Sequence, residues 1–317
     1  MWVSEIMLQQ TRVAAVIERY HEFLRRFPNL QKLAAARESS VLAAWSGLGY
    51  YRRARMLHTA SKLVARELKG KFPRTAAEWR LLPGVGRYTS AAIASIAFNQ
   101  PVAVVDGNVE RVIQRIAGQR LPAERLWTTA EAWLDRDRPG DFNQAMMELG
   151  ATVCTPRAPV CLVCPVSHLC ATRGELPSKV RTAPQKKREI HYALHCRTSP
   201  GARGQLFLVR RPQHASLMAG MWELPEIPAP PRDAQPLFAV RHSITVTDYK
   251  VLVWPANGST PSQGKWVPPD RLAKLPITGL TRKILRKAGM LITRGSSSQA
   301  LASKSSIVSS NDSKPSR

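Results

Sequence analysis

The chain has 317 residues, of which 44% are hydrophobic, so it is long enough for two domains of ordinary size. Its 47 lysines and arginines against 22 aspartates and glutamates give a formal net charge of +25, which indicates a polyanionic partner, nucleic acid before a membrane surface. No apolar run approaches a membrane-spanning length and the N-terminus lacks signal-peptide features, so we expect a cytosolic, reducing location and no membrane partner.

Residues 1–150 carry helical patterns and no strand pattern, so we expect a mainly α first domain. Apolar residues recur at helical intervals through residues 6–27, and five of them form one predicted stripe: Val13, Val16, Ile17, Tyr20 and Leu24. Glycines and prolines separate the later helical patterns, which cover residues 40–45, 52–68, 76–82, 88–98, 109–116 and 124–134.

A short glycine-containing turn separates two of these helical patterns. It reads LPGVGR and consists of Leu82, Pro83, Gly84, Val85, Gly86 and Arg87. Two glycines two residues apart allow a tight turn, and the positive end of the following helix can bind a phosphate through backbone amides. An ordinary helix–turn–helix corner is the alternative, but the arginine and the overall charge favour a phosphate-binding hairpin.

Two carboxylates are candidate catalytic groups, although they lie far apart in the sequence. Glu5 has apolar neighbours at positions 6–8, and burial among them would raise its pKa and suit a general acid. Asp106 follows the apolar run PVAVV and precedes a helical pattern. The ordinary interpretations are a first-turn surface glutamate and a helix N-cap. Carboxylates in two different environments are what cleavage of a glycosidic bond requires.

Four cysteines close the first domain with the spacing C-x6-C-x2-C-x5-C: Cys154, Cys161, Cys164 and Cys170. Four thiolates this close in sequence suit either zinc or an iron–sulfur cluster. Two disulfides are the alternative, but they require an oxidising compartment that nothing in the chain indicates. The fifth cysteine, Cys196, lies in an alternating run and is predicted to be a small core residue.

The composition changes after residue 178. Residues 179–188 hold five basic residues and no acid, which indicates a basic linker that is either a solvated tether or a phosphate contact. EIHYALHC and GQLFLVRR are typical of strands, LFAVRHSITVTDYKVLVWP predicts a hairpin, and residues 275–288 predict a closing helix, so residues 189–293 form a predicted α+β domain. Residues 294–317 are rich in serine and lysine and are predicted to be disordered.

The order of the motifs SEIMLQQT, GLGYYRRA, LPGVGRYTSAAI and VDGNVERV, the four cysteines and GMWELP resembles the adenine DNA glycosylases of the MutY family over about residues 2–290. The resemblance implies a helix–hairpin–helix glycosylase domain with a [4Fe–4S] cluster over residues 1–178, and a Nudix-like lesion-recognition domain over residues 189–293. It also implies a monomer associated with the bacterial nucleoid, and hydrolytic removal of adenine mispaired with 8-oxoguanine or guanine in double-stranded DNA, in base excision repair. Family members carry a further N-terminal segment with a helix, which we expect to be missing here.

The resemblance implies a role for each matching residue. Glu5 matches the acid that protonates the adenine ring, Asp106 matches the carboxylate that stabilises the sugar cation, and Tyr88 and Asn108 match their active-site neighbours. Residues that enter or grip the duplex around the lesion are matched by Gln10, Thr11, Leu48 and Tyr50. Taken singly, Tyr50 is more typical of a core aromatic and Gln10 of a helix-surface amide.

Two further features decide between related functions. Endonuclease III is similar in fold and cluster but carries a lysine directly after the hairpin arginine, where this chain has Tyr88, so we expect base removal without efficient strand cleavage. The bifunctional glycosylase/lyase remains one alternative. A catalytically silent DNA-binding protein is the other, because we expect the family's N-terminal segment to be missing here.

The lesion-reading loop of the second domain departs from the family pattern. Ile244, Thr245 and Val246 occupy the places of a Phe-Ser-His type triplet. The hydroxyl of Thr245 could bond 8-oxoguanine, whereas Val246 cannot replace an imidazole. The glutamate-rich metal-binding helix of Nudix hydrolases is absent from the sequence, so we interpret this domain as a lesion reader rather than a pyrophosphatase.

Overall fold

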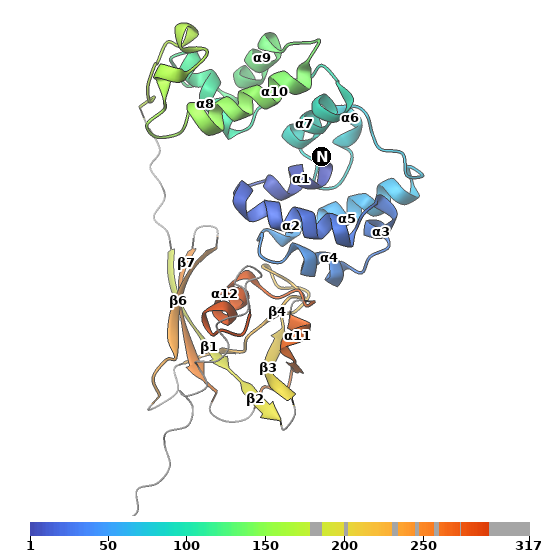
Figure 1. Ribbon diagram of the computed structural model, residues 1–317, viewed down its shortest axis with the longest axis vertical. Helices are drawn as coiled ribbons and strands as arrows, with labels where there is room; N and C mark the ends of the chain where they lie inside the picture. Colours follow the sequence, from blue (N-terminus) through green and yellow to red (C-terminus); the bar gives the residue numbers. More distant parts are fainter. Residues whose placement is uncertain are drawn as a thin grey trace, which may run out of the picture.

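The computed structural model of the chain describes residues 1–177, 186–199, 202–229, 234–244, 247–256, 260–272 and 274–291. Most of the predicted linker, Thr245 and Val246 of the predicted lesion-reading loop, and the predicted disordered tail lie outside these residues. Figure 1 shows the helices of the first half at one end and the strands of the second half at the other.

The first half is built from helices, as the sequence predicts. They are α1 (Trp2–Leu8), α2 (Val13–Arg26), α3 (Leu30–Ala34), α4 (Glu38–Trp45), α5 (Tyr51–Arg66), α6 (Ala76–Trp79), α7 (Arg87–Phe98), α8 (Gly107–Ile116), α9 (Ala123–Trp133) and α10 (Pro139–Glu148). The helical run expected through residues 6–27 is two helices. The break falls at residues 9–12, where Gln10 takes a φ of 52°, which an α-helix does not contain.

The predicted stripe on α2 is partly wrong. Val16 is buried, but Val13 and Ile17 are 62% and 51% exposed. Helix α2 contacts the core through Val16 and Phe23, and Phe27, the residue that ends the helix, continues this buried row. The row is rotated about the helix axis from the predicted stripe. The rotation follows from the aromatic rings, because Phe23 and Phe27 pack edge-to-face with centroids 4.9 Å apart.

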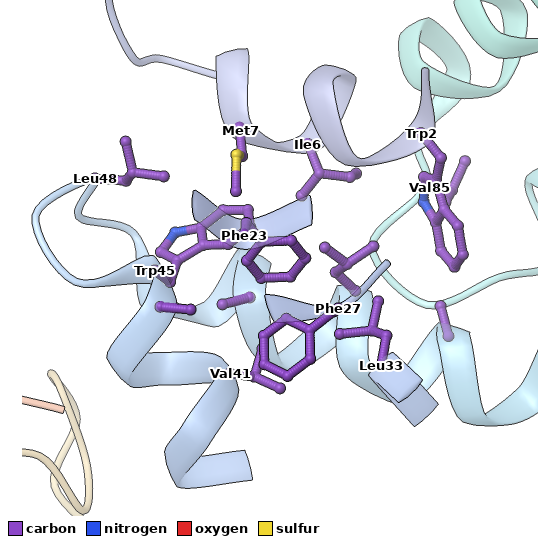
Figure 2. Packing of buried hydrophobic residues seen from close by; sticks show 14 of the residues in the cluster. Trp2, Ile6, Met7, Phe23, Phe27, Leu33, Val41, Trp45, Leu48 and Val85 are labelled. Carbon is purple, nitrogen blue, oxygen red and sulfur yellow. The ribbon is translucent and has the colours of Figure 1, made fainter. Parts of the chain in front are cut away.

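The helical core fixes the position of α1 (Figure 2). Ile6 and Met7 of α1 are buried against a cluster that includes Phe23 and Trp45, and both of those side chains are fully enclosed. Each fully buried apolar side chain of this size contributes about 1.5–3 kcal/mol relative to exposure. The seven-residue helix α1, too short to be stable alone, is therefore held by its packing.

Short helical turns lead into and through the cysteine loop. A π-helical turn (Leu149–Val153) continues α10, and two 3-10 turns follow at Cys161–Val163 and Ser167–Leu169. Each of these turns ends at or next to a cysteine, so the loop is folded by local turns rather than by a strand or long helix.

The second half is α+β, as predicted. Its strands are β1 (Lys186–Leu194), β2 (Cys196–Ser199), β3 (Ala202–Arg210), β4 (Trp222–Glu223), β5 (Glu226–Ile227), β6 (Phe238–Ile244), β7 (Thr247–Pro255) and β8 (Lys265–Val267). One sheet has the order β5-β1-β7-β6, with β1 parallel to β7; the other has the order β2-β3-β4, with β8 on β3. Helix α11 (Pro269–Leu272) follows β8, and α12 (Gly279–Lys287) packs between the sheets (Figure 1).

Three expectations about this half can be compared with the structure. The predicted hairpin is confirmed, since β6 and β7 pair antiparallel. The closing helix is confirmed but begins at Gly279, because Thr278 caps it by accepting a hydrogen bond from the amide of Thr281. The core prediction for Cys196 is wrong: it begins β2 at the edge of its sheet and is exposed. No helix in the described ranges is long and apolar enough to cross a bilayer.

Candidate functional site

Glu5 is a buried carboxylic acid on the first helix. It is 8% exposed, and the hydroxyl of Tyr88 on α7 donates to its Oε2 at 3.1 Å. Burial raises the pKa of Glu5, and the Tyr88 hydrogen bond offsets this rise only in part. The environment therefore favours the protonated form that a general acid needs.

Asp106 lies at the N-terminus of α8 and caps it. Its Oδ1 accepts from the amides of Asn108 and Val109 at 2.9 and 2.8 Å, and its Oδ2 accepts from the Asn108 side-chain nitrogen at 3.0 Å. The N-cap interpretation of Asp106 is thus confirmed. It does not exclude a catalytic one, because the same contacts fix the direction of the charged group.

Helices α1, α7 and α8 bring Glu5, Tyr88 and Asp106 into one neighbourhood. Burial raises the pKa of Tyr88 well above its usual range, and the charges of Glu5 and Asp106 raise it further. The charge of Asp106 also raises the pKa of Glu5. The two carboxylates that the sequence leaves far apart therefore interact electrostatically across a phenol. The Sδ of Met147, 3.4 Å from the Tyr88 hydroxyl, borders the same place.

Arg53 anchors the segment that carries Gln10 and Thr11. Its guanidinium donates to the carbonyls of Ile6 (3.0 Å), Met7 (3.1 Å) and Gln9, and to Thr11 Oγ1 at 2.9 Å. The last carbonyls of a helix have no partner within the helix, so Arg53 caps α1 by side-chain donation. The arginine thereby fixes Thr11 beside an exposed Gln10.

The loop between α4 and α5 places Leu48 and Tyr50 differently. Leu48 is 6% exposed and packs near Trp45 and Met7, as Figure 2 shows. Tyr50 is 51% exposed, so the core-aromatic interpretation of this residue is wrong. Its φ of 46° lies in the left-handed region, which costs a non-glycine residue about 1–3 kcal/mol. Strain of this kind persists only where the surroundings impose it.

The LPGVGR turn connects α6 to α7 and has the geometry that its glycines predict. Leu82 and Val85 are buried and hold the turn, while Gly86 and Arg87 are exposed at the start of α7. Gly84 has a φ of 81°, and a Cβ there would lie 2.6 Å from the Cβ of Met56, so no other residue fits without movement. The backbone at the start of α7 is thus exposed, as anion binding by the first-turn amides requires.

Arg87 is oriented by two neighbours on α9. Its guanidinium lies 4.0 Å from the ring centroid of Trp127, and its Nη1 lies 3.3 Å from a Glu124 oxygen. Stacking on an indole keeps an arginine extended at low entropic cost. Pro83, beside Gly84, is half-buried in the turn.

The four cysteines line one cavity together with Arg115. Nη1 of Arg115 donates to Cys154 Sγ at 3.3 Å, and the amide of Arg173 donates to Cys170 Sγ at 3.4 Å. A cation and amide donors directed at sulfur stabilise thiolates, which is the ionised form that binds metal.

The four thiols suit two kinds of metal group. Among the described residues, no three cysteine, histidine or acidic side chains meet closely enough to hold a single metal ion. Zinc requires all four sulfurs at about 2.3 Å from one point. A [4Fe–4S] cluster also takes four cysteine thiolates, so these residue types are compatible with either group.

Arg111 connects the candidate catalytic helix to the cysteine loop. Its Nη2 donates to Asn108 Oδ1 at 2.8 Å and its Nε donates to the carbonyl of Cys154 at 2.7 Å. Gly150 makes this approach possible, because a Cβ there would lie 2.6 Å from the Cβ of Asn108. Asp106, Asn108, Arg111 and the first cysteine form one continuous set of contacts.

The sequence-based prediction does not include Arg53, Arg111, Arg115 or Met147. Arg111 lies three residues after Asn108 on a helix, and this spacing is a signal that could have identified it. Nothing in the sequence indicates which carbonyls Arg53 reaches or that Met147 faces Tyr88. Of the lesion-reading triplet, Ile244 ends β6, whereas Thr245 and Val246 lie outside the described residues.

Comparisons with known proteins agree with this arrangement. Residues 3–135 match the model of the HhH-GPD superfamily of base excision DNA repair proteins. Curated relatives named adenine DNA glycosylase include those of Mus musculus, 43% identical over 73% of this chain and 55% of the relative, and of Schizosaccharomyces pombe, 37% identical over 71% and 59%. The chain thus spans about half the length of the first such relatives.

Solved structures extend the likeness to the fold of the helical half. A thermostable thymine-DNA glycosylase is 31% identical, with a TM-score of 0.51 over 54% of this chain and 82% of that one. A non-covalent endonuclease III–DNA complex is 24% identical with a TM-score of 0.50 over the same shares. The second likeness concerns the fold alone.

Proposed function

The chain belongs to the HhH-GPD superfamily of base excision DNA repair proteins, with adenine DNA glycosylases among its relatives, and we propose that it removes adenine opposite 8-oxoguanine or guanine in double-stranded DNA. The observation that carries the proposal is the grouping of Glu5, Tyr88 and Asp106, two unlike carboxylates around one phenol. The names of the relatives indicate that the released base is adenine. The chemistry of the three residues indicates that the bond cleaved is the glycosidic bond.

Each of the three residues has a part in the proposed hydrolysis. Glu5, whose pKa is raised by burial, donates a proton to the ring of the departing adenine as the bond to the sugar C1′ breaks. Asp106, fixed by the α8 amides, stabilises the positive charge that develops on the sugar until water adds to C1′. Tyr88 provides no amine, so no Schiff base forms and the product is an abasic site rather than a strand break.

The exposure of each residue determines how it could contact DNA in this proposal. The LPGVGR turn binds a phosphate through the start of α7, and the extruded adenine leaves a gap next to Gln10, Thr11, Leu48 and Tyr50. Leu48 must leave its buried position if it is to enter the duplex, whereas the half-exposed Tyr50 is ready to do so. The proposed protein acts as a monomer in the bacterial nucleoid.

Cys154, Cys161, Cys164 and Cys170 hold a [4Fe–4S] cluster in this proposal. Their shared cavity and the donors directed at sulfur support it. The cluster would stiffen the cysteine loop, and the chain's own Arg111 transmits that rigidity to Asn108. Residues 1–178 would then be the glycosylase domain, residues 179–188 a linker and residues 189–293 the Nudix-like lesion reader, with Thr245 the contact to 8-oxoguanine.

A base-release assay tests the proposed reaction. The full chain is incubated with a duplex containing one adenine opposite 8-oxoguanine, and alkali then cleaves any abasic site. We expect cleavage at the adenine only after alkali. Cleavage before alkali, with borohydride trapping a covalent adduct, would identify a lyase instead. An intact strand after alkali, with salt-dependent binding retained, would identify a catalytically silent DNA-binding protein.

Metal analysis of the purified protein tests the proposed cofactor. We expect iron and acid-labile sulfide in equal amounts and a brown colour, and Cys164→Ser should lower both together with the affinity for duplex DNA. The exposed Cys196 offers the matched control, because Cys196→Ser should change neither the iron and sulfide content nor the affinity for duplex DNA. Stoichiometric zinc in a colourless protein would contradict the cluster.

A further inference from the structure

The loop that bears Leu48 and Tyr50 is tied to the second half of the chain. Here we call residues 46–51 the wedge loop. Gly47, Gly49 and Tyr50 all have positive φ values, 106°, 71° and 46°. The two glycines adopt such angles freely, but Tyr50 is strained, so its surroundings must maintain this conformation.

Contacts within the helical half maintain one side of the wedge loop. Nε1 of Trp45 donates to the carbonyl of Gly49 at 3.2 Å, and the guanidinium of Arg53 lies 5.1 Å from the Tyr50 ring centroid. These contacts act on the tip of the loop. Its base, at Ser46 and Tyr51, is held by a different part of the chain.

The side chains at both ends of that base bond to one carbonyl oxygen of the second half. Ser46 Oγ donates to the carbonyl of Ile277 at 3.0 Å, and the hydroxyl of Tyr51 lies 3.4 Å from the same oxygen. Ser46 and Ile277 are fully buried and Tyr51 is 5% exposed, so these hydrogen bonds are shielded from water. A hydrogen bond shielded in this way is costly to break, because its groups would stay buried without partners.

Arg282 completes the arrangement from α12. Its Nε donates to Ser46 Oγ at 3.1 Å, so the serine hydroxyl accepts from Arg282 while it donates to Ile277. A Cβ on Gly47 would lie 3.9 Å from Arg282 Cδ and 3.7 Å from Arg19 Nε, which places the loop between the two arginines. Burial, followed by the like charge of Arg19, lowers the pKa of Arg282 to about 10. A cation in such a place is costly unless a specific contact requires it there.

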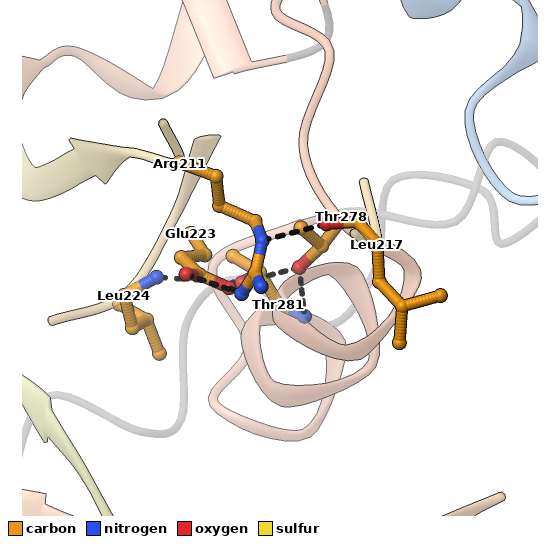
Figure 3. A network of polar contacts seen from close by, with 6 residues as sticks. All are labelled: Arg211, Leu217, Glu223, Leu224, Thr278 and Thr281. Atoms are coloured by element: carbon orange, nitrogen blue, oxygen red, sulfur yellow. Dashed lines mark hydrogen bonds and ion pairs between the residues drawn. The ribbon is translucent and has the colours of Figure 1, made fainter. Parts of the chain in front are cut away.

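Backbone contacts on both sides hold Ile277 in place. The segment before α12 forms a parallel bridge to β4, in which the amide of Thr278 donates to the carbonyl of Trp222 at 3.0 Å. Figure 3 shows the network behind this bridge: the Thr278 hydroxyl contacts Thr281 Oγ1 at 2.9 Å, and Thr281 Oγ1 accepts from the amide of Leu224. The carbonyl that receives Ser46 is therefore part of a fixed frame.

A second contact attaches the same frame to the helical half. Met221, which precedes β4, is fully buried in the hydrophobic cluster of the helical half, and Arg55 of α5 donates to the carbonyl of Ala219. Arg211 holds the segment before β4 in place: its Nη1 donates to both carboxylate oxygens of Glu223 at 2.7 and 2.9 Å, and its Nε donates to the Leu217 carbonyl (Figure 3). The two halves therefore meet through matched polar and apolar contacts.

We infer that the second half presets the wedge loop for adenine extrusion, with Ile277 and Arg282 as positioning residues that act through Ser46 and Tyr51. This inference rests on the proposed function. It gives the second half a role besides reading the lesion, because its docking supports the strained loop from which Tyr50 enters the duplex. Arg282 touches no reacting atom, so its effect falls on extrusion and not on proton transfer.

The test separates extrusion from chemistry in the full chain. Ser46→Ala, Tyr51→Phe, Arg282→Met and Arg282→Lys are compared with Arg286→Met, an exposed arginine on the same helix. Extrusion is followed by the fluorescence of 2-aminopurine at the target position, in proteins that also carry Glu5→Gln so that no base is released. Single-turnover release of adenine opposite 8-oxoguanine is measured with Glu5 intact.

Ser46→Ala and Arg282→Met should each lower extrusion and single-turnover release by about tenfold, the scale expected for losing a buried hydrogen bond. Tyr51→Phe should have a smaller effect, and Arg282→Lys should restore part of the loss. Affinity for undamaged duplex should not change, and Arg286→Met should stay within about twofold of the unaltered protein. A merely structural defect would lower the melting temperature and the DNA affinity without this selective loss.

Failure of this inference and failure of the proposed function would give different results. If the unaltered protein releases adenine and the Ser46→Ala and Arg282→Met proteins extrude and release it equally well, the inference is overturned and the proposed function stands. An equal loss in Arg286→Met would also overturn it, because the effect would then come from general charge. If the unaltered protein releases no adenine, the proposed function fails, while the fluorescence still reports whether Arg282 supports extrusion.

Discussion

Glu5→Gln is expected to lower single-turnover adenine release by about 10²- to 10⁴-fold, the usual contribution of a general acid, while the affinity for duplex is retained. Glutamine keeps the volume of the side chain and an oxygen that can accept from the Tyr88 hydroxyl, whose bond to Glu5 Oε2 is 3.1 Å. It has no proton to give to the adenine ring. Release within tenfold of the unaltered rate would remove Glu5 from the acid role.

The same substitution should make the protein more stable at neutral pH. The pKa of Glu5 is raised in the folded protein from an ordinary value of 4.5, with burial the largest cause. The folded state therefore binds this proton more tightly than the unfolded state. The corresponding stability is present below pH 4.5 and is lost as the pH rises through the raised pKa. Above that pKa the protein carries a buried charge that glutamine lacks.

Melting temperatures measured from about pH 5 to about pH 8 check this expectation. The difference between Glu5→Gln and the unaltered protein should increase with pH in favour of the variant. Glu18→Gln is the matched control, because Glu18 is exposed on α2 and its replacement should give a small and constant difference. A Glu5→Gln protein that melts lower at every pH would mean that the carboxylate is a structural contact. A gain in stability with a loss of turnover is typical of a functional residue.

The sequence predicted what local patterns determine. The helical and α+β halves, the β6–β7 hairpin and the glycine turn before α7 follow from periodicity and turn chemistry, and the structure has all of them. Gly84 illustrates the reason. Its positive φ and its 2.6 Å approach to Met56 are backbone requirements that leave a signature at a single position. The grouping of Glu5 with Asp106 came from the resemblance and not from any such pattern.

Contacts between distant segments left no comparable signature. Arg53 caps α1 from another helix, and Ile277 receives Ser46 from the other half of the chain. Both interactions use a backbone carbonyl as the acceptor, and every residue has one, so the partner is determined by packing alone. The error on α2 has the same origin. Val13 and Ile17 fit a helical stripe, but neighbouring helices decide which stripe is buried.

Asp106 performs two tasks, and a pair of substitutions separates them. Its Oδ1 caps α8 by accepting from the amides of Asn108 and Val109. Asparagine is as good an N-cap as aspartate, so Asp106→Asn should leave the free energy of unfolding within about 0.5 kcal/mol of the unaltered protein. Asp106→Ala removes the cap and should cost about 0.5–2 kcal/mol. Urea unfolding of both proteins provides these values.

Activity should not follow stability in this pair. The neutral amide of Asp106→Asn cannot balance positive charge on the sugar, so we expect it to lower single-turnover adenine release about as much as alanine does, by about 10²- to 10³-fold. An Asp106→Asn protein that releases adenine at the unaltered rate, beside an inactive Asp106→Ala protein, would reduce Asp106 to a helix cap. Equal losses of activity with unequal losses of stability would identify the charge itself as the catalytic contribution.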